Sequence, residues 1–304
     1  MPLARGIIRN PLAQSHRKIF VLEARNFHLT LGRQTKIMGI LNITPDSFSG
    51  DGILSYPHHK YNPEKCVLLA QKLVSDGADI IDIGGESTRP GSRRITAKEE
   101  IKRVIPNLRI LAKKIKIPIS IDTYKETVAQ CALDNGASII NNIMGVKITS
   151  KFLKIIKKYN AAIVLMHIRG TPQTMQKNVR YQNLIGDIIE ELQKAIEKCL
   201  EIGIKSDKII IDPGIGFGKT VEDNLKIIRR LEDFRILNRP ILIGTSRKSF
   251  IGKILNRDIT KRVMGTAATV CASILNGAHI VRVHDVKEIK DVVKMTDALL
   301  DTNP

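Results

Sequence analysis

Short runs of Ile and Val recur along the chain, and polar residues end several of them. Residues 209–211 are Ile-Ile-Ile, and Asp212 follows them before a stretch rich in Gly. Similar runs end at Asp122, Asn141 and His284. Apolar runs without polar alternation are typical of parallel strands that helices cover. The pattern therefore predicts an α/β fold in which many strand ends contribute polar groups to one site.

Strand-like and helix-like segments alternate over most of the 304 residues. Strands are predicted at 37–42, 79–84, 117–122, 137–141, 161–166, 208–212, 240–244 and 278–283. Helices are predicted at 63–77, 96–115, 124–135, 149–159, 183–203, 221–233, 258–276 and 285–301. Eight βα units of nearly uniform spacing favour a closed (β/α)8 TIM barrel over an open doubly wound sheet.

The N-terminal region precedes the first βα unit. Residues 17–36 are predicted to form a short hairpin that closes the barrel bottom. No linker rich in Gly, Ser or Pro divides residues 18–304, so we expect a single barrel domain there. Residues 1–17 are expected to be a disordered extension.

The cysteines and the hydropathy pattern indicate the cellular compartment in which the protein is expected. The four cysteines are widely spaced without a Cys-x-x-Cys pair, and each lies in a predicted helix, which indicates buried free thiols. A reducing cytoplasm fits this usage. No apolar run reaches about 18 residues, so no membrane span is expected. The basic first 18 residues lack the apolar core of a secretory signal.

The formal net charge of +19 allows three interpretations. A solvated, lysine-rich surface is the simplest, and Lys151, Lys154, Lys157 and Lys158 illustrate it on one predicted helix. Nucleic-acid binding is an alternative, but aromatic residues make up only 4% of the chain and no binding motif is visible. Attraction of an anionic substrate is the third. We therefore expect no nucleic-acid partner.

Two long polar segments leave the first two strands, at residues 42–52 and 84–92. Barrel loops this rich in Gly, Ser and Asp usually serve as lids or binding loops. Asp122, Asn141 and Asp212 end strands on the same expected face. Helix capping is an alternative role for each Asp. Together, two carboxylates and an amide suit a flat heterocycle with an edge of NH donors.

An anion site is predicted at the last strand. Arg282 and His284 alternate with Val281 and Val283, so the polar pair shares one face and precedes a helix N-terminus. Lys248, next to another helix start, is a further candidate for an anion or a ring carbonyl. Asn42 and Asp46 are candidates for Mg²⁺ bridged to a pyrophosphate, since this ion needs few protein ligands.

Several segments, read together, resemble the dihydropteroate synthase family. They are Gly-Ile-Leu-Asn-Ile-Thr-Pro-Asp-Ser-Phe at 39–48, Gly-Gly-Glu-Ser-Thr-Arg-Pro-Gly at 84–91, Asp-Pro-Gly at 212–214, Ser-Arg-Lys-Ser at 246–249 and Arg-Val-His-Asp at 282–285. The resemblance runs from about residue 19 to 300. It implies a (β/α)8 barrel, usually dimeric, that joins 4-aminobenzoate to 7,8-dihydropterin-6-ylmethyl diphosphate and releases pyrophosphate, with Mg²⁺ assisting.

The resemblance also implies residue roles. A pterin site would comprise Asp122, Asn141, Asp212 and Lys248, with Met166 and Phe217 packing beside the ring. A diphosphate site would comprise Arg282, His284 and Asn42, with Asn42 toward the metal. Thr88, Arg89 and Ser249 would shape the aminobenzoate site. The catalytic residues would be Asp122, Lys248, Arg282 and His284.

Two departures from the family pattern stand beside this resemblance. Asn142 occupies a position where the family commonly has Asp, and residues 49–52 read Ser-Gly-Asp-Gly where Ser-Asp-Gly-Gly is usual. The alternative function is a pterin-binding methyltransferase of the same barrel type, which would need no diphosphate site. The complete Ser-Arg-Lys-Ser segment and the two long loops argue against that alternative.

Overall fold

The computed structural model describes residues 17–44, 63–87, 92–175 and 179–301. Eight parallel strands run in the order β8-β7-β6-β5-β4-β3-β10-β9. Their bounds are β3 Lys36–Asn42, β4 Ile80–Gly84, β5 Ile119–Asp122, β6 Ile139–Asn142, β7 Ala162–Met166, β8 Ile209–Asp212, β9 Leu242–Ile243 and β10 Ile280–Val283. A parallel bridge between Ile211 and Ile241 joins the two outer strands of this order. The predicted TIM barrel is therefore confirmed.

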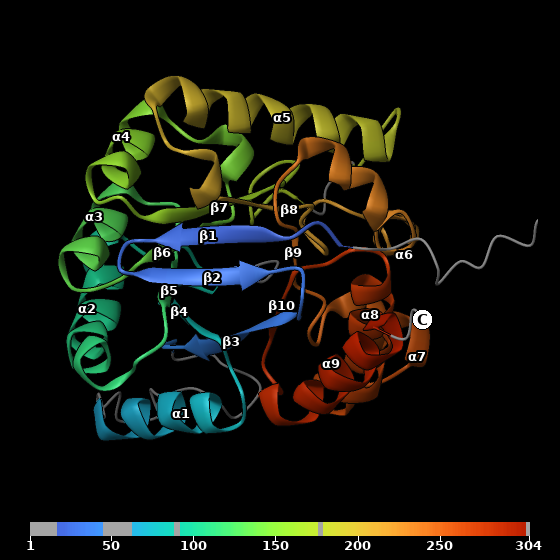
Figure 1. Ribbon diagram of the computed structural model, residues 1–304, viewed down its shortest axis with the longest axis horizontal. Helices are drawn as coiled ribbons and strands as arrows, with labels where there is room; N and C mark the ends of the chain where they lie inside the picture. The colour runs from blue at the N-terminus through green and yellow to red at the C-terminus, as the bar shows by residue number, and fades with distance from the viewer. Residues whose placement is uncertain (1–16, 45–62, 88–91, 176–178, 302–304) are drawn as a thin grey trace, which may run out of the picture.

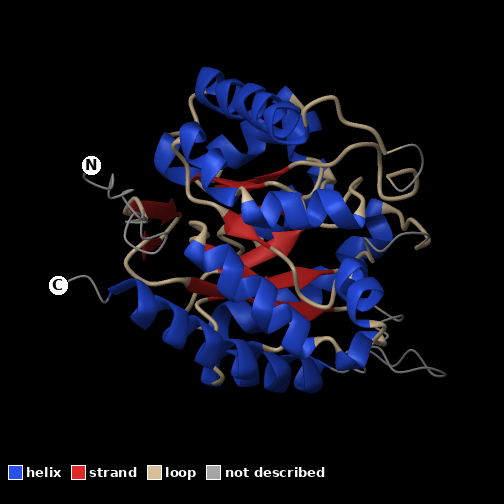
Figure 2. Ribbon diagram, turned by 90° about the vertical axis from the view of Figure 1, so that its right-hand side faces the viewer, coloured by secondary structure: helices blue, strands red, loops and turns tan. Residues whose placement is uncertain are grey.

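Helices surround the strands on the outside of the barrel (Figures 1 and 2). They are α1 Pro63–Ser75, α2 Ala97–Lys114, α3 Glu126–Asp134, α4 Ser150–Lys158, α5 Leu184–Ile202, α6 Val221–Arg229, α7 Ser249–Leu255, α8 Val263–Leu275 and α9 Val286–Asp301. The outward-facing strand residues, such as Ile121, Ile163 and Val281, pack in one cluster with apolar helix residues such as Leu108 and Leu192. In the part of the chain that the structure describes, no helix is long and apolar enough to cross a membrane.

The region after β8 differs from the prediction. The helix predicted at 221–233 ends at Arg229, and a 3₁₀ helix, η3 (Leu231–Leu237), follows it. The helix predicted at 258–276 is a short 3₁₀ turn followed by α8. A helix start was predicted beside Lys248, but no range was predicted for the seven-residue helix α7, because it is too short to show a clear period. It ends at Asn256, whose φ of 50° is left-handed and terminates the helix.

The predicted N-terminal hairpin is confirmed. It consists of β1 (Phe20–Ala24) and β2 (Phe27–Leu31), which pair antiparallel. Leu22, Ala24 and Leu31 pack against the inward-facing residues at the N-terminal ends of the strands, among them Met38 and Ile210. The hairpin lies across the barrel in Figure 1. It therefore seals one end of the barrel with an apolar layer.

The barrel interior changes from apolar to polar along each strand. Because successive side chains of a strand point to opposite faces, the residue two positions after an inward Ile also points inward. Ile80 is followed in this way by Asp82, Ile139 by Asn141, Ile210 by Asp212 and Ile280 by Arg282. A layer of charged and amide side chains thus lies directly above the apolar layer, toward the open end of the barrel.

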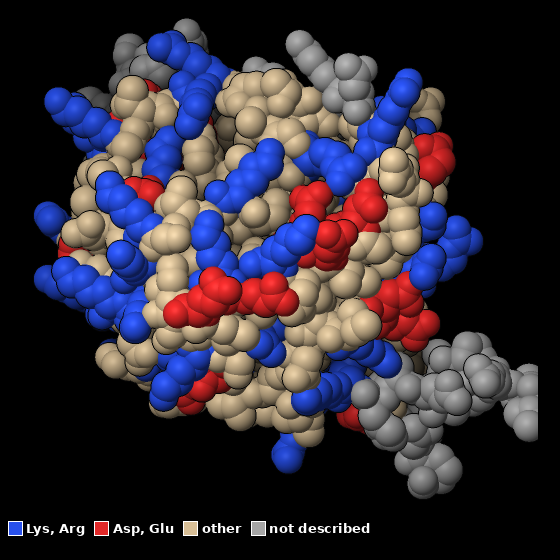
Figure 3. Space-filling view, turned by 90° about the horizontal axis from the view of Figure 1, so that it is seen from above, with Lys and Arg blue, Asp and Glu red and all other residues tan. Residues whose placement is uncertain are grey.

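The basic residues are distributed rather than gathered on the face seen in Figure 3. Lys and Arg side chains cover much of that face, and Asp and Glu lie between them. The arrangement on this face fits a solvated, mixed-charge surface.

Arg17, at which the predicted extension 1–17 and the predicted hairpin region 17–36 overlap, belongs to the folded barrel. Its Nη2 lies 2.6 Å from Asp297 Oδ1 of α9, and its Nη1 donates to the carbonyl of Ala278 at 2.9 Å. Both side chains of the ion pair are almost fully buried. Removal of one partner from such a pair leaves an uncompensated buried charge.

We therefore expect Arg17→Ala to lower the free energy of unfolding by about 3 kcal/mol, the scale of a broken buried pair. Denaturant unfolding measures this change. Arg33→Ala, which removes an exposed arginine close by, is the control and should change stability by less than about 0.5 kcal/mol. Equal effects of the two substitutions would show that the Arg17–Asp297 ion pair adds nothing to the free energy of unfolding.

Candidate active site

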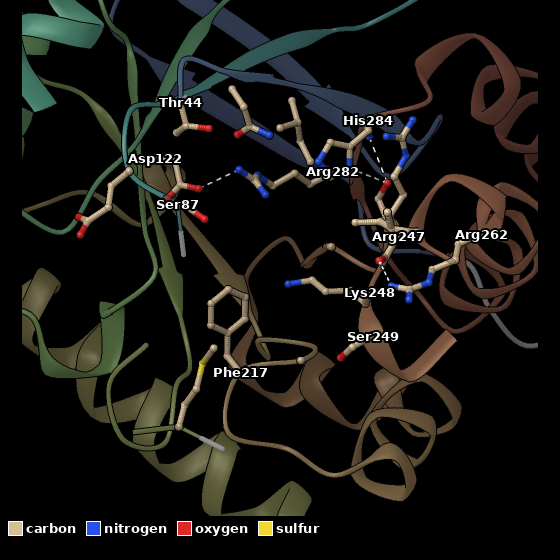
Figure 4. A pocket seen from close by; sticks show the side chains of 18 residues that line it. Thr44, Ser87, Asp122, Phe217, Arg247, Lys248, Ser249, Arg262, Arg282 and His284 are labelled. Carbon is tan, nitrogen blue, oxygen red and sulfur yellow. Dashed lines mark hydrogen bonds and ion pairs between the residues drawn. The ribbon is translucent and has the colours of Figure 1, made fainter. Parts of the chain in front are cut away.

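A cavity of about 250 Å³ opens at the C-terminal ends of the strands. Several of the predicted site residues line it: Asn42, Asp122, Phe217, Lys248, Ser249, Arg282 and His284. In Figure 4, Arg282, Lys248 and Phe217 point toward the same space from different elements. The structure thus brings together residues that lie up to 242 positions apart, from Asn42 to His284.

Arg282 is the centre of the polar layer. Its Nε donates to Asp82 Oδ2 at 2.6 Å, and its Nη2 donates to Asp122 Oδ2 at 2.8 Å (Figure 4 shows the second contact). Asp82 is fully buried and was not predicted as a site residue. The signal that could have found it is its alternation with Ile80, which places it on the same face of β4 as the other inward residues.

Asp122 lines the cavity and keeps one carboxylate oxygen without a partner among the described residues. One carboxylate oxygen binds Arg282, while Oδ1 is buried without a hydrogen-bond partner among the described residues. Burial raises the pKa of Asp122 to about 7, and the Arg282 charge opposes that rise. The alternative role of helix capping is not observed, because Lys125 precedes α3 and no side chain caps it.

Asn141 and Asp212 lie in the same layer, and both are covered, with 3% and 5% of their surface exposed. Asn141 donates from Nδ2 to Asp82 at 3.3 Å, and its Oδ1 has no partner among the described residues. Asp212 accepts the Gly214 backbone N–H at 2.7 Å. Burial raises the pKa of Asp212 to about 6. Neither side chain lines the cavity itself, but both keep acceptor capacity beneath it.

Lys248 and Phe217 form the opposite wall. Lys248 directly precedes α7, as predicted, and its Nζ lies 4.1 Å from the centroid of the Phe217 ring. Burial lowers the pKa of Lys248 to about 8, and the Arg282 charge adds to that decrease. Met166, which was predicted to pack on a flat ring, belongs to the same small apolar cluster as Phe217.

The segments around Arg247 and His284 are tied together. Ser246 Oγ and His284 Nδ1 are 3.0 Å apart, and the His284 backbone N–H donates to the same Ser246 Oγ. Arg247 has a left-handed φ of 56°, and its Nε donates to Asp285 Oδ2 at 3.0 Å. These contacts fix the backbone that presents Lys248 and His284. The supporting roles of Ser246, Arg247 and Asp285 were not predicted.

Some predicted residues lie outside the described part of the chain. Thr88, Arg89 and Asp46 belong to this group, together with most of the first long loop and the Gly50-Asp51 departure. The second loop is described up to Ser87, which lines the cavity beside Glu86. Asn142, the other departure from the family pattern, accepts the Met144 backbone N–H at 2.8 Å through its amide oxygen.

The described residues contain no group of three His, Cys, Asp or Glu side chains that could hold a metal by themselves. Asn42 lines the cavity together with Arg282 and His284 and offers a hard amide oxygen there. Mg²⁺ prefers oxygen ligands and is often held by one or two protein groups plus substrate phosphates. The donor set therefore fits only a metal that a bound diphosphate helps to hold.

Sequence comparison places the chain in a known group. A family model described as pterin binding enzyme matches residues 38–284. Dihydropteroate synthase of Bacillus subtilis is 45% identical over 282 residues, which cover 92% of this chain and 94% of the relative. The chain belongs to the dihydropteroate synthases of the pterin-binding enzyme family. Members of this family are transferases of folate biosynthesis.

Solved structures agree with this assignment. Yersinia pestis dihydropteroate synthase, solved as a sulfonamide drug complex, matches with a TM-score of 0.87 and 37% identity over 93% of this chain and 100% of that chain. Xanthomonas albilineans dihydropteroate synthase, solved with 4-aminobenzoic acid, matches with a TM-score of 0.84 and 32% identity over 94% and 100% of the two chains. The family resemblance in the sequence is thereby confirmed.

The raised pKa of Asp212 predicts a pH-dependent stability. The folded protein holds a proton on this carboxyl group up to about pH 6, whereas the unfolded chain loses it near the ordinary value of 3.8. The folded state therefore binds more protons within this window, and the free energy of unfolding decreases as the pH rises through it.

We expect Asp212→Asn to remove this part of the pH dependence, because the amide does not titrate. Urea unfolding between pH 4 and pH 7 measures the change, with the exposed Asp291→Asn as the matched control. If the Asp212 and Asp291 variants keep the same pH dependence as the parent protein, burial does not perturb Asp212.

Proposed function

We propose that the protein condenses 4-aminobenzoate with 7,8-dihydropterin-6-ylmethyl diphosphate to give 7,8-dihydropteroate and pyrophosphate. The observation that carries this proposal is the division of one cavity into two chemical halves. The acceptors are Asp122 on the cavity wall and Asn141 and Asp212 beneath it, and cationic donors lie at Arg282 and His284 on β10 and its end. A ligand with NH donors at one end and a diphosphate at the other fits this division.

The pterin ring occupies the acceptor half in this proposal. Its amino group and ring N–H can donate in parallel to a carboxylate, which makes a charge-assisted two-point contact. Asp212 is assigned this contact, while the open oxygens of Asp122 and Asn141 take the remaining donors. Lys248 donates to the ring carbonyl, and Phe217 packs against the ring. Burial of these groups makes their pairing with the ligand worth more than it would be in water.

The diphosphate occupies the cationic half. Arg282 and His284 stabilise the charge that develops on the leaving oxygen as the C–O bond breaks. The pterin ring spreads the positive charge of the methylene carbon that the diphosphate leaves behind, and Asp122 stabilises that cation. When bound, Mg²⁺ would neutralise diphosphate charge, and Asn42 would hold it together with the diphosphate. The amino nitrogen of 4-aminobenzoate then forms the new C–N bond and loses a proton.

The second substrate enters beside Ser249, at the start of α7. Thr88 and Arg89 complete this site in the proposal, and the two long loops exclude water from the reactive cation. Lys248 lies between the pterin and aminobenzoate positions, because it directly precedes Ser249 and contacts Phe217.

We also propose that the protein is a cytoplasmic homodimer. Exposed apolar side chains on the C-terminal helices support a self-association surface, among them Leu255 on α7, Met264 on α8 and Met295 on α9. The free cysteines, two of them buried, support a reducing compartment.

The test of the proposed function is release of pyrophosphate from the pterin diphosphate in the presence of 4-aminobenzoate and Mg²⁺. We expect stoichiometric pyrophosphate and 7,8-dihydropteroate, with neither formed when aminobenzoate is left out. Pyrophosphate release that is independent of aminobenzoate would indicate a hydrolase instead. The absence of any reaction would contradict the proposal.

A further prediction separates the role of Arg282 in pyrophosphate binding from its role in the stability of the fold. Arg282→Gln should weaken pyrophosphate binding by about 1.5–3 kcal/mol, the range for a hydrogen bond to a charged group. It should also lower the melting temperature, because Asp82 and Asp122 lose their shared cation. Calorimetric titration and thermal unfolding measure the two effects.

The control is Asp82→Asn, which removes one of the two ion pairs but leaves the Arg282 charge and its pair with Asp122 in place. We expect this variant to retain pyrophosphate affinity while its melting temperature changes. Equal losses of pyrophosphate affinity in the Arg282 and Asp82 variants would mean that Arg282 acts only through the fold.

A further inference from the structure

Lys219 is a buried lysine to which the proposed reaction assigns no role. It lies in the loop between β8 and α6 and is 3% exposed. Its Nζ donates to the carbonyl of Phe217 at 3.0 Å and lies 3.0 Å from Nδ1 of His167. Lysines are rarely buried, because the charged form loses its hydration. Burial accordingly lowers the pKa of Lys219 to about 7. The amino group can donate hydrogen bonds in both its charged and its neutral form.

The loop folds closely around this amino group. Gly214, Gly216 and Gly218 all have left-handed φ values, of 74°, 81° and 66°. A Cβ atom at Gly214 would lie 3.4 Å from Lys219 Nζ and only 1.9 Å from the carbonyl oxygen of His167. Glycines give the backbone this freedom at the cost of rigidity. The contacts of Lys219 Nζ with Phe217 and His167 restrain this glycine-rich backbone.

His167 anchors the other side of the same arrangement. Its backbone N–H donates to the carbonyl of Asp212 at 2.9 Å, so it is tied to the end of β8. Burial lowers the pKa of His167 to about 4, which leaves the ring neutral and Nδ1 able to accept from Lys219. The ring proton then resides on Nε2, 3.3 Å from the carboxylate of Glu191.

The loop carries groups that face the cavity. Phe217, whose carbonyl Lys219 holds, lines the cavity and contacts Lys248 through its ring. Asp212, at the start of the loop, shares the turn through its hydrogen bond with the Gly214 N–H. A shift of the loop would therefore move the ring of Phe217 and the carboxylate of Asp212 together.

We propose that Lys219 is a positioning residue, whose side-chain amino group fixes the β8–α6 loop so that Phe217 and Asp212 are held in place for the pterin ring. The inference rests on the proposed function of the same cavity. Lys219 acts from beneath the loop through Phe217 and His167. The diphosphate half of the cavity is built on β10 and does not depend on it.

The test compares the full-length protein with Lys219→Met, which keeps an unbranched side chain and removes the donors. Calorimetric titrations use an unphosphorylated 7,8-dihydropterin and, separately, pyrophosphate with Mg²⁺. We expect dihydropterin affinity to fall at least about tenfold, on the scale of a lost hydrogen bond to a charged group. Pyrophosphate affinity should stay at the parent value. Lys226→Met, an exposed lysine on α6, is the matched control and should leave both affinities unchanged.

A second variant, Lys219→Gln, restores a shorter neutral donor. We expect it to recover part of the dihydropterin affinity that the Met variant loses, an effect that a purely structural role would not produce. Parent-like dihydropterin binding in the Met variant would overturn the inference. If the Gln variant loses affinity for both dihydropterin and pyrophosphate, the inference is also overturned. Failure of the parent protein to bind the dihydropterin would instead reject the proposed function, and this inference with it.

Discussion

The shared ion pair of Arg282 with Asp82 and Asp122 is the interaction on which the active site depends. Charged groups inside a protein are tolerated only when they are paired and hydrogen-bonded. A single guanidinium pairs with one oxygen of each of two carboxylates from two other strands and still borders the cavity. The apolar layer below, sealed by the hairpin of β1 and β2, keeps water away from the bottom of this charged layer. The polar groups of the site therefore stand on these ion pairs and on the apolar layer below them.

The incomplete pairing of this layer is what prepares it for a ligand. Asp122 and Asn141 each keep one buried oxygen without a partner among the described residues, so the fold carries the cost of desolvation in advance. A pterin that donates to these oxygens would recover that cost on binding. The raised pKa values of Asp122 and Asp212 show the same cost of desolvation, because burial disfavours the charged forms of both carboxyl groups. Binding and fold stability are therefore opposed at these positions.

The sequence predicted the barrel, its closing hairpin and the strand-end residues, because apolar runs and strand alternation are local properties. It did not identify Asp82, whose importance arises from contacts with Arg282 two hundred positions away. Lys219 was missed for a related reason, since a lysine after a glycine-rich loop gives no local sign of burial. The extent of helix α7 was missed because seven residues are too few to show a helical period. Pairing across the barrel could not be predicted from the local pattern.

The most direct test of this account is a crystal structure of the protein with a 7,8-dihydropterin bound. The account predicts that the ring lies within hydrogen-bond distance of Asp122, Asn141 and Asp212, with Phe217 against it and with Arg282 still paired to Asp82. A pterin that binds outside the barrel mouth, or one that makes no contact with these three acceptors, would contradict it.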